Sequence, residues 1–270
     1  MEEKLKQSLL ILLSFVVFLP TGYAQKNYGK PVREKIDKGL ILFQYRGFDE
    51  PQFVNVLRVK KPRKVSLAWS DPELKTTSAF AVENSALAAV NAGFFDMKNG
   101  GSVTYLKVDG QEISRNAKEN PQITRSALVI TKRGAVILEK ALAPDYYSKA
   151  DSYDDVIFTG PLLLLDGQQP ALDTASAFVS YRHPRTAACT LKNGDLLLLT
   201  ADGRATEALG LSLPQLADFM QELGCKDAIN LDGGGSTTLW VKGSVRNHPS
   251  DNRQFDNRGE RKVANVVLVH

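Results

Sequence analysis

The stretch Asn230-Leu231-Asp232-Gly233-Gly234-Gly235-Ser236-Thr237-Thr238 combines one carboxylate, three glycines and a row of hydroxyls. The apolar residues that lead into it, 228–231, predict a strand whose tip carries Asp232. Glycine allows close backbone approaches to a ligand, and successive N–H groups in such a turn can form an anion-binding nest. The stretch therefore predicts either a carboxylate beside an anion cradle or a tight turn that Asp232 closes.

A helix is predicted directly before this strand. Ser212 is a favourable N-cap residue, and Gln215 three positions later completes a capping box. Pro214 falls in the first turn, where its missing N–H costs little. Apolar residues at helical spacing then predict a core-facing stripe: Leu216, Phe219, Met220 and Leu223.

Short strand patterns separated by turn signals dominate the rest of the sequence. Residues 196–200 form a continuous apolar run, which is typical of a strand buried on both faces. We therefore predict an α+β fold with a mostly β core of mixed sheets and a few packed helices, in a single domain. Residues 77–84 are the second helix that the pattern favours.

The first residues have the pattern of a secretory signal peptide. A mixed-charge start precedes an apolar run, 9–19, and small residues precede a predicted cut between Ala24 and Gln25. The run is short for a membrane-spanning helix. We predict that residues 1–24 are removed, that the protein is secreted or periplasmic, and that no stable membrane insertion follows cleavage. An uncleaved membrane anchor is the alternative.

Charge and cysteine content narrow the function classes. The chain has 34 basic and 30 acidic residues, a net charge of +4, which gives no reason to expect a nucleic-acid partner. The two cysteines, Cys189 and Cys225, lack the CxxC or histidine spacing of a zinc site. A disulfide and two buried free thiols both remain open for them.

Further motifs accompany the glycine stretch in a fixed order. They are Asn91-Ala92-Gly93-Phe94-Phe95-Asp96, His183-Pro184-Arg185-Thr186-Ala187, Asp202-Gly203-Arg204, Asn247-His248-Pro249-Ser250 and Glu260-Arg261-Lys262-Val263-Ala264-Asn265. Together with the glycine stretch they resemble the phosphodiester glycosidase family over residues 82–270. Residues 25–75, the N-terminal lead and first strands, carry no recognisable family motif. Residues 76–270 are expected to form the phosphodiester glycosidase-like catalytic domain.

The resemblance implies an enzyme of carbohydrate metabolism that cleaves the glycosidic bond of a sugar-1-phosphodiester. An N-acetylglucosamine-1-phosphodiester is one example, and the products would be free sugar and a phosphomonoester. The expected partner is a sugar-phosphate or glycan substrate. A non-catalytic carbohydrate-binding or cell-envelope protein on the same scaffold is the alternative, and an enzyme acting on another linkage is a third, because fold similarity alone does not settle the substrate.

Three residues are the candidates for catalysis. A phosphate leaves as a stable anion, so the reaction chiefly needs a carboxylate to stabilise an oxocarbenium-like transition state or to assist attack. Asp232 is the first candidate and Asp202 is the second carboxylate. His183 could bind phosphate or donate a proton, with a structural hydrogen bond as its alternative role.

Substrate binding is expected from groups that suit phosphate and sugar hydroxyls. Arg185 is the first choice for phosphate because its planar fork can bind two oxygens, and Arg261 is a second choice. In an extended segment, Arg185 and His183 point to the same side. The remaining candidates are neutral: Asn91, Gly233, Gly234, Gly235, Ser236 and Asn247.

No cofactor is required by this reaction. Asp232, Asp202 and Asn91 carry the oxygen atoms that calcium or magnesium prefers, so a structural or catalytic ion of either kind is the open alternative. The sequence contains no DxDxDG loop and no HExxH motif.

Overall fold

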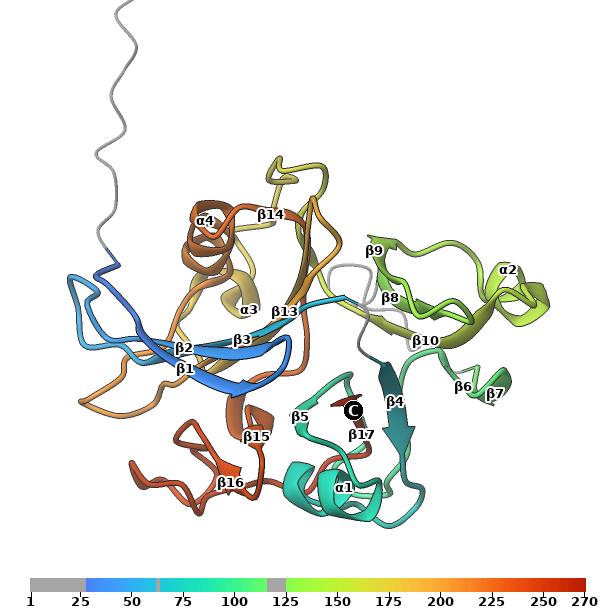
Figure 1. The fold of residues 1–270 in the computed structure, drawn as a ribbon, viewed down its shortest axis with the longest axis horizontal. Helices are drawn as coiled ribbons and strands as arrows, with labels where there is room; N and C mark the ends of the chain where they lie inside the picture. Colours follow the sequence, from blue (N-terminus) through green and yellow to red (C-terminus); the bar gives the residue numbers. More distant parts are fainter. Residues whose placement is uncertain (1–27, 62–63, 116–124) are drawn as a thin grey trace, which may run out of the picture.

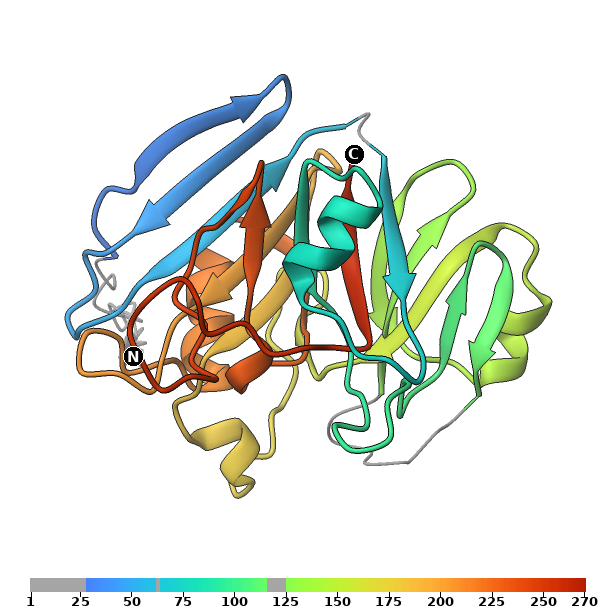
Figure 2. The same cartoon turned by 90° about the horizontal axis from the view of Figure 1, so that it is seen from below.

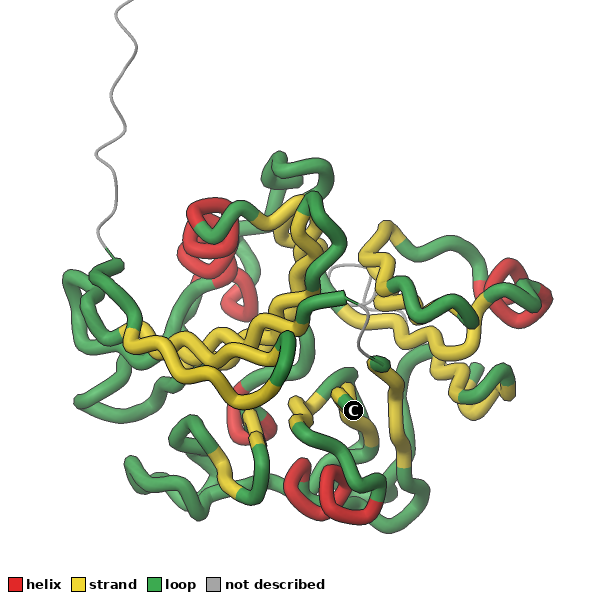
Figure 3. The backbone as a smooth tube through the Cα atoms, in the orientation of Figure 1, coloured by secondary structure: helices red, strands yellow, loops and turns green. Residues whose placement is uncertain are grey.

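The computed structural model describes residues 28–61, 64–115 and 125–270. The predicted signal peptide lies outside these residues. Within them, strands form three sheets and the helices lie at the periphery (Figures 1 and 3). The described residues include no helix that is both long and apolar enough to cross a membrane.

The largest sheet has seven strands. Its order is β1 (Val32–Asp37), β2 (Leu40–Tyr45), β3 (Val54–Val59), β13 (Leu196–Ala201), β12 (Arg185–Leu191), β14 (Cys225–Asn230) and β11 (Leu162–Leu164). Strand β13 is buried along its whole length, which confirms the prediction from its continuous apolar run.

Two five-stranded sheets complete the β structure. The second sheet has the order β7 (Gln111–Ser114), β6 (Leu106–Val108), β10 (Tyr153–Thr159), β8 (Ser126–Thr131) and β9 (Val136–Lys140). The third has the order β16 (Ser244–Val245), β15 (Leu239–Val241), β5 (Ala88–Asn91), β17 (Asn265–Val269) and β4 (Val65–Trp69). Figure 2 shows the third sheet in front of the other two.

The pairings between these named strands are all antiparallel. The expectation of mixed sheets was therefore wrong in this respect, whereas the mostly β core with few helices is confirmed. Continuous apolar runs arise here without parallel pairing because both faces of the central strands are covered. One buried cluster joins the three sheets through residues such as Leu198, Ile157 and Val267.

The described residues contain four α-helices: α1 (Thr77–Glu83), α2 (Pro144–Lys149), α3 (Ala177–Ser180) and α4 (Leu213–Glu222). Helix α4 begins at the predicted capping box, in which Ser212 accepts from the backbone of Gln215 and the Gln215 side chain accepts from the backbone of Ser212. Its apolar stripe, including Phe219 and Met220, packs on the seven-stranded sheet. This packing fixes the start of β14, at whose far end the glycine turn lies.

A disulfide joins Cys189 on β12 to Cys225 on β14, with a Cα–Cα distance of 5.8 Å. The sequence left both a disulfide and two free thiols open, and the structure contains the disulfide. Both half-cystines lie in the buried cluster beneath α4. The bridge therefore links two neighbouring strands of the sheet that carries the candidate site.

We expect the double variant Cys189→Ala/Cys225→Ala to lose about 4 kcal/mol of unfolding free energy, because the bridge closes a loop across 36 positions and restricts the unfolded chain. Urea denaturation measures this loss. A reductant should lower the midpoint of the parent and leave that of the variant unchanged. Equal midpoints for the two oxidised proteins would contradict the prediction.

Candidate active site

The glycine turn connects the seven-stranded sheet to the third sheet. The Asp232 N–H donates to the Ala92 carbonyl (2.7 Å), and the Asn91 side-chain amide donates to the Asp232 carbonyl (2.5 Å). The Gly234 N–H donates to the Pro184 carbonyl (2.9 Å). The carboxylate of Asp232 therefore projects from a backbone that is held on two sides.

Each glycine of the turn has a neighbour where a Cβ atom would lie. A Cβ on Gly233 would meet the Pro184 carbonyl oxygen, and one on Gly234 would approach the Arg204 guanidinium. A Cβ on Gly235 would overlap the Arg261 guanidinium. Two cationic side chains thus lie directly against the turn, and at Gly234 a positive φ of 64° further favours glycine.

Burial raises the pKa of Asp232 to about 6, although Ser236, Arg261 and the Gly233 N–H each favour its ionised form. The Ser236 hydroxyl is fully buried and lies close to the carboxylate, but it forms no well-aligned hydrogen bond with a described residue. Desolvation therefore outweighs the nearby positive charge. The carboxylate gains or loses its proton close to neutral pH.

Arg261 is the predicted second phosphate ligand. Its Nε and one terminal nitrogen donate to the Asp251 carboxylate at 2.9 and 2.5 Å. The other terminal nitrogen contacts the sulfur of Met97 at 3.6 Å. Its guanidinium is therefore oriented by Asp251 while remaining against Gly235.

Arg204 belongs to the Asp202-Gly203-Arg204 motif but was not among the candidate site residues. It is exposed and has a left-handed backbone, with φ of 64°, which is uncommon for a residue with a side chain. Its guanidinium forms no hydrogen bond or ion pair with any residue in the described part of the chain. Its side chain is a cation beside the turn that is free to bind an anion. Its position next to Asp202 and Gly203 in the motif was the feature of the sequence that could have identified it.

Asp202 is fully buried and holds His248. One carboxylate oxygen lies 2.7 Å from His248 Nδ1, and the other accepts the His248 backbone N–H at 3.1 Å. Burial raises the pKa of Asp202, and the contacts with His248 act in the opposite direction. Asp202, which was predicted as a catalytic carboxylate, therefore orients His248, a histidine that was not among the candidate site residues.

The His248 imidazole is fixed by two aromatic rings and at its Nδ1 atom. Its ring stacks on Phe255 with a centroid distance of 3.9 Å, and Phe53 packs edge-on at 5.5 Å. Its Nε2 forms no hydrogen bond within the described residues, and the side chain is 19% exposed. A carboxylate–histidine pair of this kind presents one ring nitrogen in a defined orientation.

Arg185 differs from its expected role. It is 2% exposed, and its guanidinium donates to the carbonyls of Leu211, Phe178 and Tyr181 at 2.8–3.0 Å. Burial lowers the pKa of Arg185 to about 10. The fork that was expected to bind phosphate instead holds α3 and the segment before α4, since it is enclosed and occupied.

His183 precedes Pro184, whose carbonyl accepts the Gly234 N–H of the turn. Its backbone pairs with Leu211 in an isolated bridge, which is consistent with the structural alternative. Burial lowers the pKa of His183, and Arg185 and Arg204 add to this effect. Its imidazole is therefore neutral at neutral pH and lies within electrostatic reach of the free cation Arg204.

The two candidate asparagines are completely buried. Asn91 accepts from the Thr186 hydroxyl and the Thr238 N–H, in addition to its bond to Asp232. Asn247 accepts from the Leu239 N–H and donates to the carbonyl of Thr237. Their expected contact with substrate is therefore corrected to a positioning role, because the amide groups are occupied and shielded.

The described residues contain no group of three or more histidine, cysteine, aspartate or glutamate side chains that could hold a metal ion. Asp232 and Asp202 are thus not joined in such a cluster. The calcium or magnesium alternative stays a prediction from the residue types.

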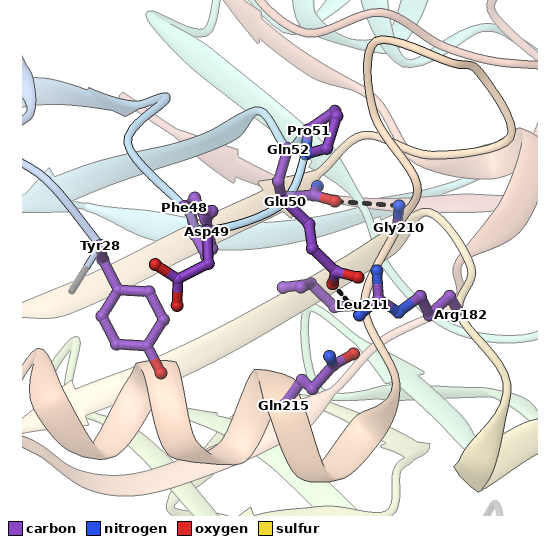
Figure 4. Close-up of a pocket in the computed structure, with 10 residues that line it drawn as sticks. All are labelled: Tyr28, Phe48, Asp49, Glu50, Pro51, Gln52, Arg182, Gly210, Leu211 and Gln215. Carbon is purple, nitrogen blue, oxygen red and sulfur yellow. Dashed lines mark hydrogen bonds and ion pairs between the residues drawn. The ribbon is translucent and has the colours of Figure 1, made fainter. Parts of the chain in front are cut away.

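A cavity of about 150 Å³ is lined by residues of the N-terminal lead, such as Gln52, and by Arg182 and Gly210 (Figure 4). Glu50 and Arg182 form an ion pair at its wall. Gln52 accepts from the Gly210 N–H at 2.9 Å and donates to the Asp202 carbonyl at 2.8 Å. The N-terminal lead, which carries no family motif, therefore helps to hold the segment from which Asp202 projects.

The sequence profile described as phosphodiester glycosidase matches residues 84–270, and the chain belongs to this family. It is similar to N-acetylglucosamine-1-phosphodiester alpha-N-acetylglucosaminidase of Mus musculus, with 33% identity over 208 residues, and to that of Homo sapiens, with 32% identity over 207. The matches cover 72% and 70% of this chain, but only 40% and 39% of those proteins.

Solved structures show the same fold. The zebrafish N-acetylglucosamine-1-phosphodiester alpha-N-acetylglucosaminidase catalytic domain, auto-inhibited by its pro-peptide, matches with a TM-score of 0.68 and 24% identity, covering 89% of this chain and 81% of that one. A hypothetical protein from Synechocystis matches with a TM-score of 0.67 and 16% identity, covering 89% of this chain and 64% of that one.

Proposed function

We propose that this protein hydrolyses the glycosidic bond of a sugar-1-phosphodiester, such as an N-acetylglucosamine-1-phosphodiester, to free sugar and a phosphomonoester. The observation that carries this proposal is the convergence of Arg204 and Arg261 on the glycine turn beside Asp232. Family membership and the names of the mouse and human relatives support the substrate class.

Each group has a task in this reaction. Arg204 and Arg261 bind the phosphate and stabilise the negative charge that it gains on leaving. The ionised Asp232 stabilises positive charge at the anomeric carbon or assists attack there. His248, oriented by Asp202, transfers a proton through its free Nε2. Overall, the oxygen of water bonds to the anomeric carbon, the bond from that carbon to the phosphate oxygen breaks, and a phosphomonoester leaves.

The proposal also includes a cellular location. Residues 1–24 act as a cleaved signal, and the mature protein works in a secreted or periplasmic setting. The Cys189–Cys225 disulfide supports this, because such bridges persist in oxidising compartments.

The purified chain from Gln25 onward tests the function with methyl N-acetyl-α-glucosaminyl phosphate as substrate and released N-acetylglucosamine as the readout. We expect release by the parent. Arg204→Ala should raise KM by roughly tenfold, because one charge-assisted contact to phosphate is lost, and Arg204→Lys should recover part of it.

Arg133→Ala is the matched control, because Arg133 lies in the exposed turn between β8 and β9 of another sheet. An unchanged KM in Arg204→Ala would remove this residue from phosphate binding. No release by the folded parent from this substrate or from UDP-N-acetylglucosamine would instead favour the carbohydrate-binding alternative.

A further inference from the structure

One of the two tryptophans lies at the surface. Trp69, at the end of the edge strand β4, is 40% exposed, whereas Trp240 is 7% exposed. The Trp69 indole N–H has no acceptor among the described residues. A large apolar ring with a free donor at its edge is suited to ligands that are apolar on one face and polar at the rim.

Trp69 borders a cavity of about 280 Å³, which we call the Trp69 pocket. The pocket lies between the edge of the third sheet and strand β7 of the second sheet. Its lining is mainly polar: Ser70, Asp71, Ser102, Ser114 and Arg115 lie around the tryptophan. Such a combination of one aromatic face with several hydrogen-bonding groups provides both contact area and orientation for a small ligand.

Asp71 supplies the free acceptor of the pocket. Its carboxylate forms no hydrogen bond or ion pair with a residue in the described ranges. It lies against Gly101, where a Cβ atom would be only 3.0 Å from a carboxylate oxygen. Gly101 also has a positive φ of 74°, so the backbone at this wall fits closely around the carboxylate.

The charges of the pocket disfavour an anionic ligand. Arg115, the cation of the lining, forms ion pairs with Asp145 and Glu112. Asp71 is left as the charge without an opposite partner. A phosphate group would therefore meet repulsion here, whereas a neutral polyol can donate hydroxyl hydrogens to Asp71.

We propose that the Trp69 pocket is a saccharide-binding site that takes a neutral pyranose ring. The C–H face of the ring packs on the Trp69 indole, and two neighbouring hydroxyls donate to the Asp71 carboxylate. A ring with equatorial hydroxyls fits best, because its faces then present only C–H groups. The indole N–H donates to an oxygen at the rim of the sugar.

This site is separate from the glycine turn but connected to it. Phe95 and Ser102 pair in an isolated bridge, and the segment between them places Met97 against Arg261, while its end lines the Trp69 pocket. The pocket can therefore hold a more distant part of a glycan. Its binding of sugar does not depend on the proposed hydrolysis.

Intrinsic tryptophan fluorescence tests the proposal, with methyl β-D-glucopyranoside and cellobiose as probes. We expect both sugars to change the emission of the parent and of Asp232→Asn equally. Asp71→Asn should weaken binding about tenfold, and Trp69→Ala by at least as much, as expected for loss of one aromatic platform. Saturation-transfer NMR measures binding where the fluorescent reporter has been removed.

Tyr181→Ala is the matched control, because Tyr181 is a 64% exposed aromatic residue outside the pocket. Circular dichroism establishes that each variant is folded. Undiminished binding in both Trp69→Ala and Asp71→Asn would overturn the proposal, as would the absence of binding of either sugar by the folded parent. Loss of binding in Asp232→Asn alone would assign the sugar to the glycine turn and would equally overturn it.

Discussion

Asp232→Asn is expected to lower kcat for a sugar-1-phosphodiester by about 10²–10⁴-fold, the range for removing a group that acts directly on the reacting atoms. The asparagine keeps the shape of the side chain but cannot carry the negative charge that an oxocarbenium-like transition state requires. Steady-state release of N-acetylglucosamine measures the effect. Equal rates for parent and variant would remove Asp232 from the reaction.

The pH dependence gives an independent signature of Asp232. Because burial raises the pKa of Asp232 to about 6, the ionised form needed for catalysis disappears below that pH. We expect kcat/KM of the parent to fall below about pH 6. The residual kcat/KM of Asp232→Asn should not show this fall at low pH.

The same pKa shift predicts that the stability of the folded protein falls as pH rises, whereas its activity increases. The pKa of Asp232 rises from its ordinary value of 3.8 to about 6 in the folded protein, so the folded state binds the proton more tightly than the unfolded state. Its contribution to stability is therefore present below the unfolded pKa and is lost as pH rises through the folded pKa. The Tm of Asp232→Asn should improve relative to the parent between about pH 4 and pH 7.

Asp155→Asn is a suitable control for both measurements. Asp155 is buried, and its carboxylate accepts the backbone N–H groups of Leu67 and Asp109. We expect its replacement to lower Tm without changing kcat. A large loss of kcat in Asp155→Asn would mean that replacing a carboxylate elsewhere in the core also disturbs the site.

The second large effect is expected at the Asp202–His248 pair. His248→Gln should lower kcat by about 10²–10³-fold, because a positioned proton-transfer group is lost. Asp202→Asn should have a similar effect, because an amide cannot hold Nδ1–H in the same way as a carboxylate. The double variant should lose little more than either single variant, as is typical of residues that act as one unit.

Kinetic and structural roles of this pair can be separated. Phe255→Leu removes the ring that stacks on His248 without touching the proton path, so we expect a smaller loss that added imidazole does not rescue. Added imidazole should partly restore a cavity variant, His248→Ala. Additive losses in the double variant, with unchanged pH profiles, would assign the pair to folding alone.

Local signals were sufficient to predict several elements of the fold. The capping box at Ser212 and the apolar stripe of α4 depend on residues within three or four positions of each other, and both are present in the structure. Strand pairing was not predictable in the same way. The residues of β13 are divided between two buried clusters, one shared with the third sheet and one shared with α4. This burial depends on residues far away in the sequence.

The same distinction applies to the site. Asp232, the glycines and Arg261, which the motifs put forward as site residues, lie together in the structure. The role of Arg185 was not predictable, because the carbonyls of Phe178 and Tyr181 that enclose it carry no sequence signal. His248 became a candidate only when the fold placed it 2.7 Å from Asp202, 46 positions earlier.

The backbone of the glycine turn is bonded to a strand end of the third sheet and to Pro184, whereas Arg204 and Arg261 lie outside the named strands. This arrangement places the carboxylate on the sheets and the two candidate phosphate ligands on the segments between them. Under the proposed function, substitutions in the surrounding loops are expected to alter which phosphodiester is accepted without displacing the carboxylate. Under the proposed function, exchange of short surface segments on such a scaffold would give new substrates while the group that acts at the anomeric carbon keeps its place.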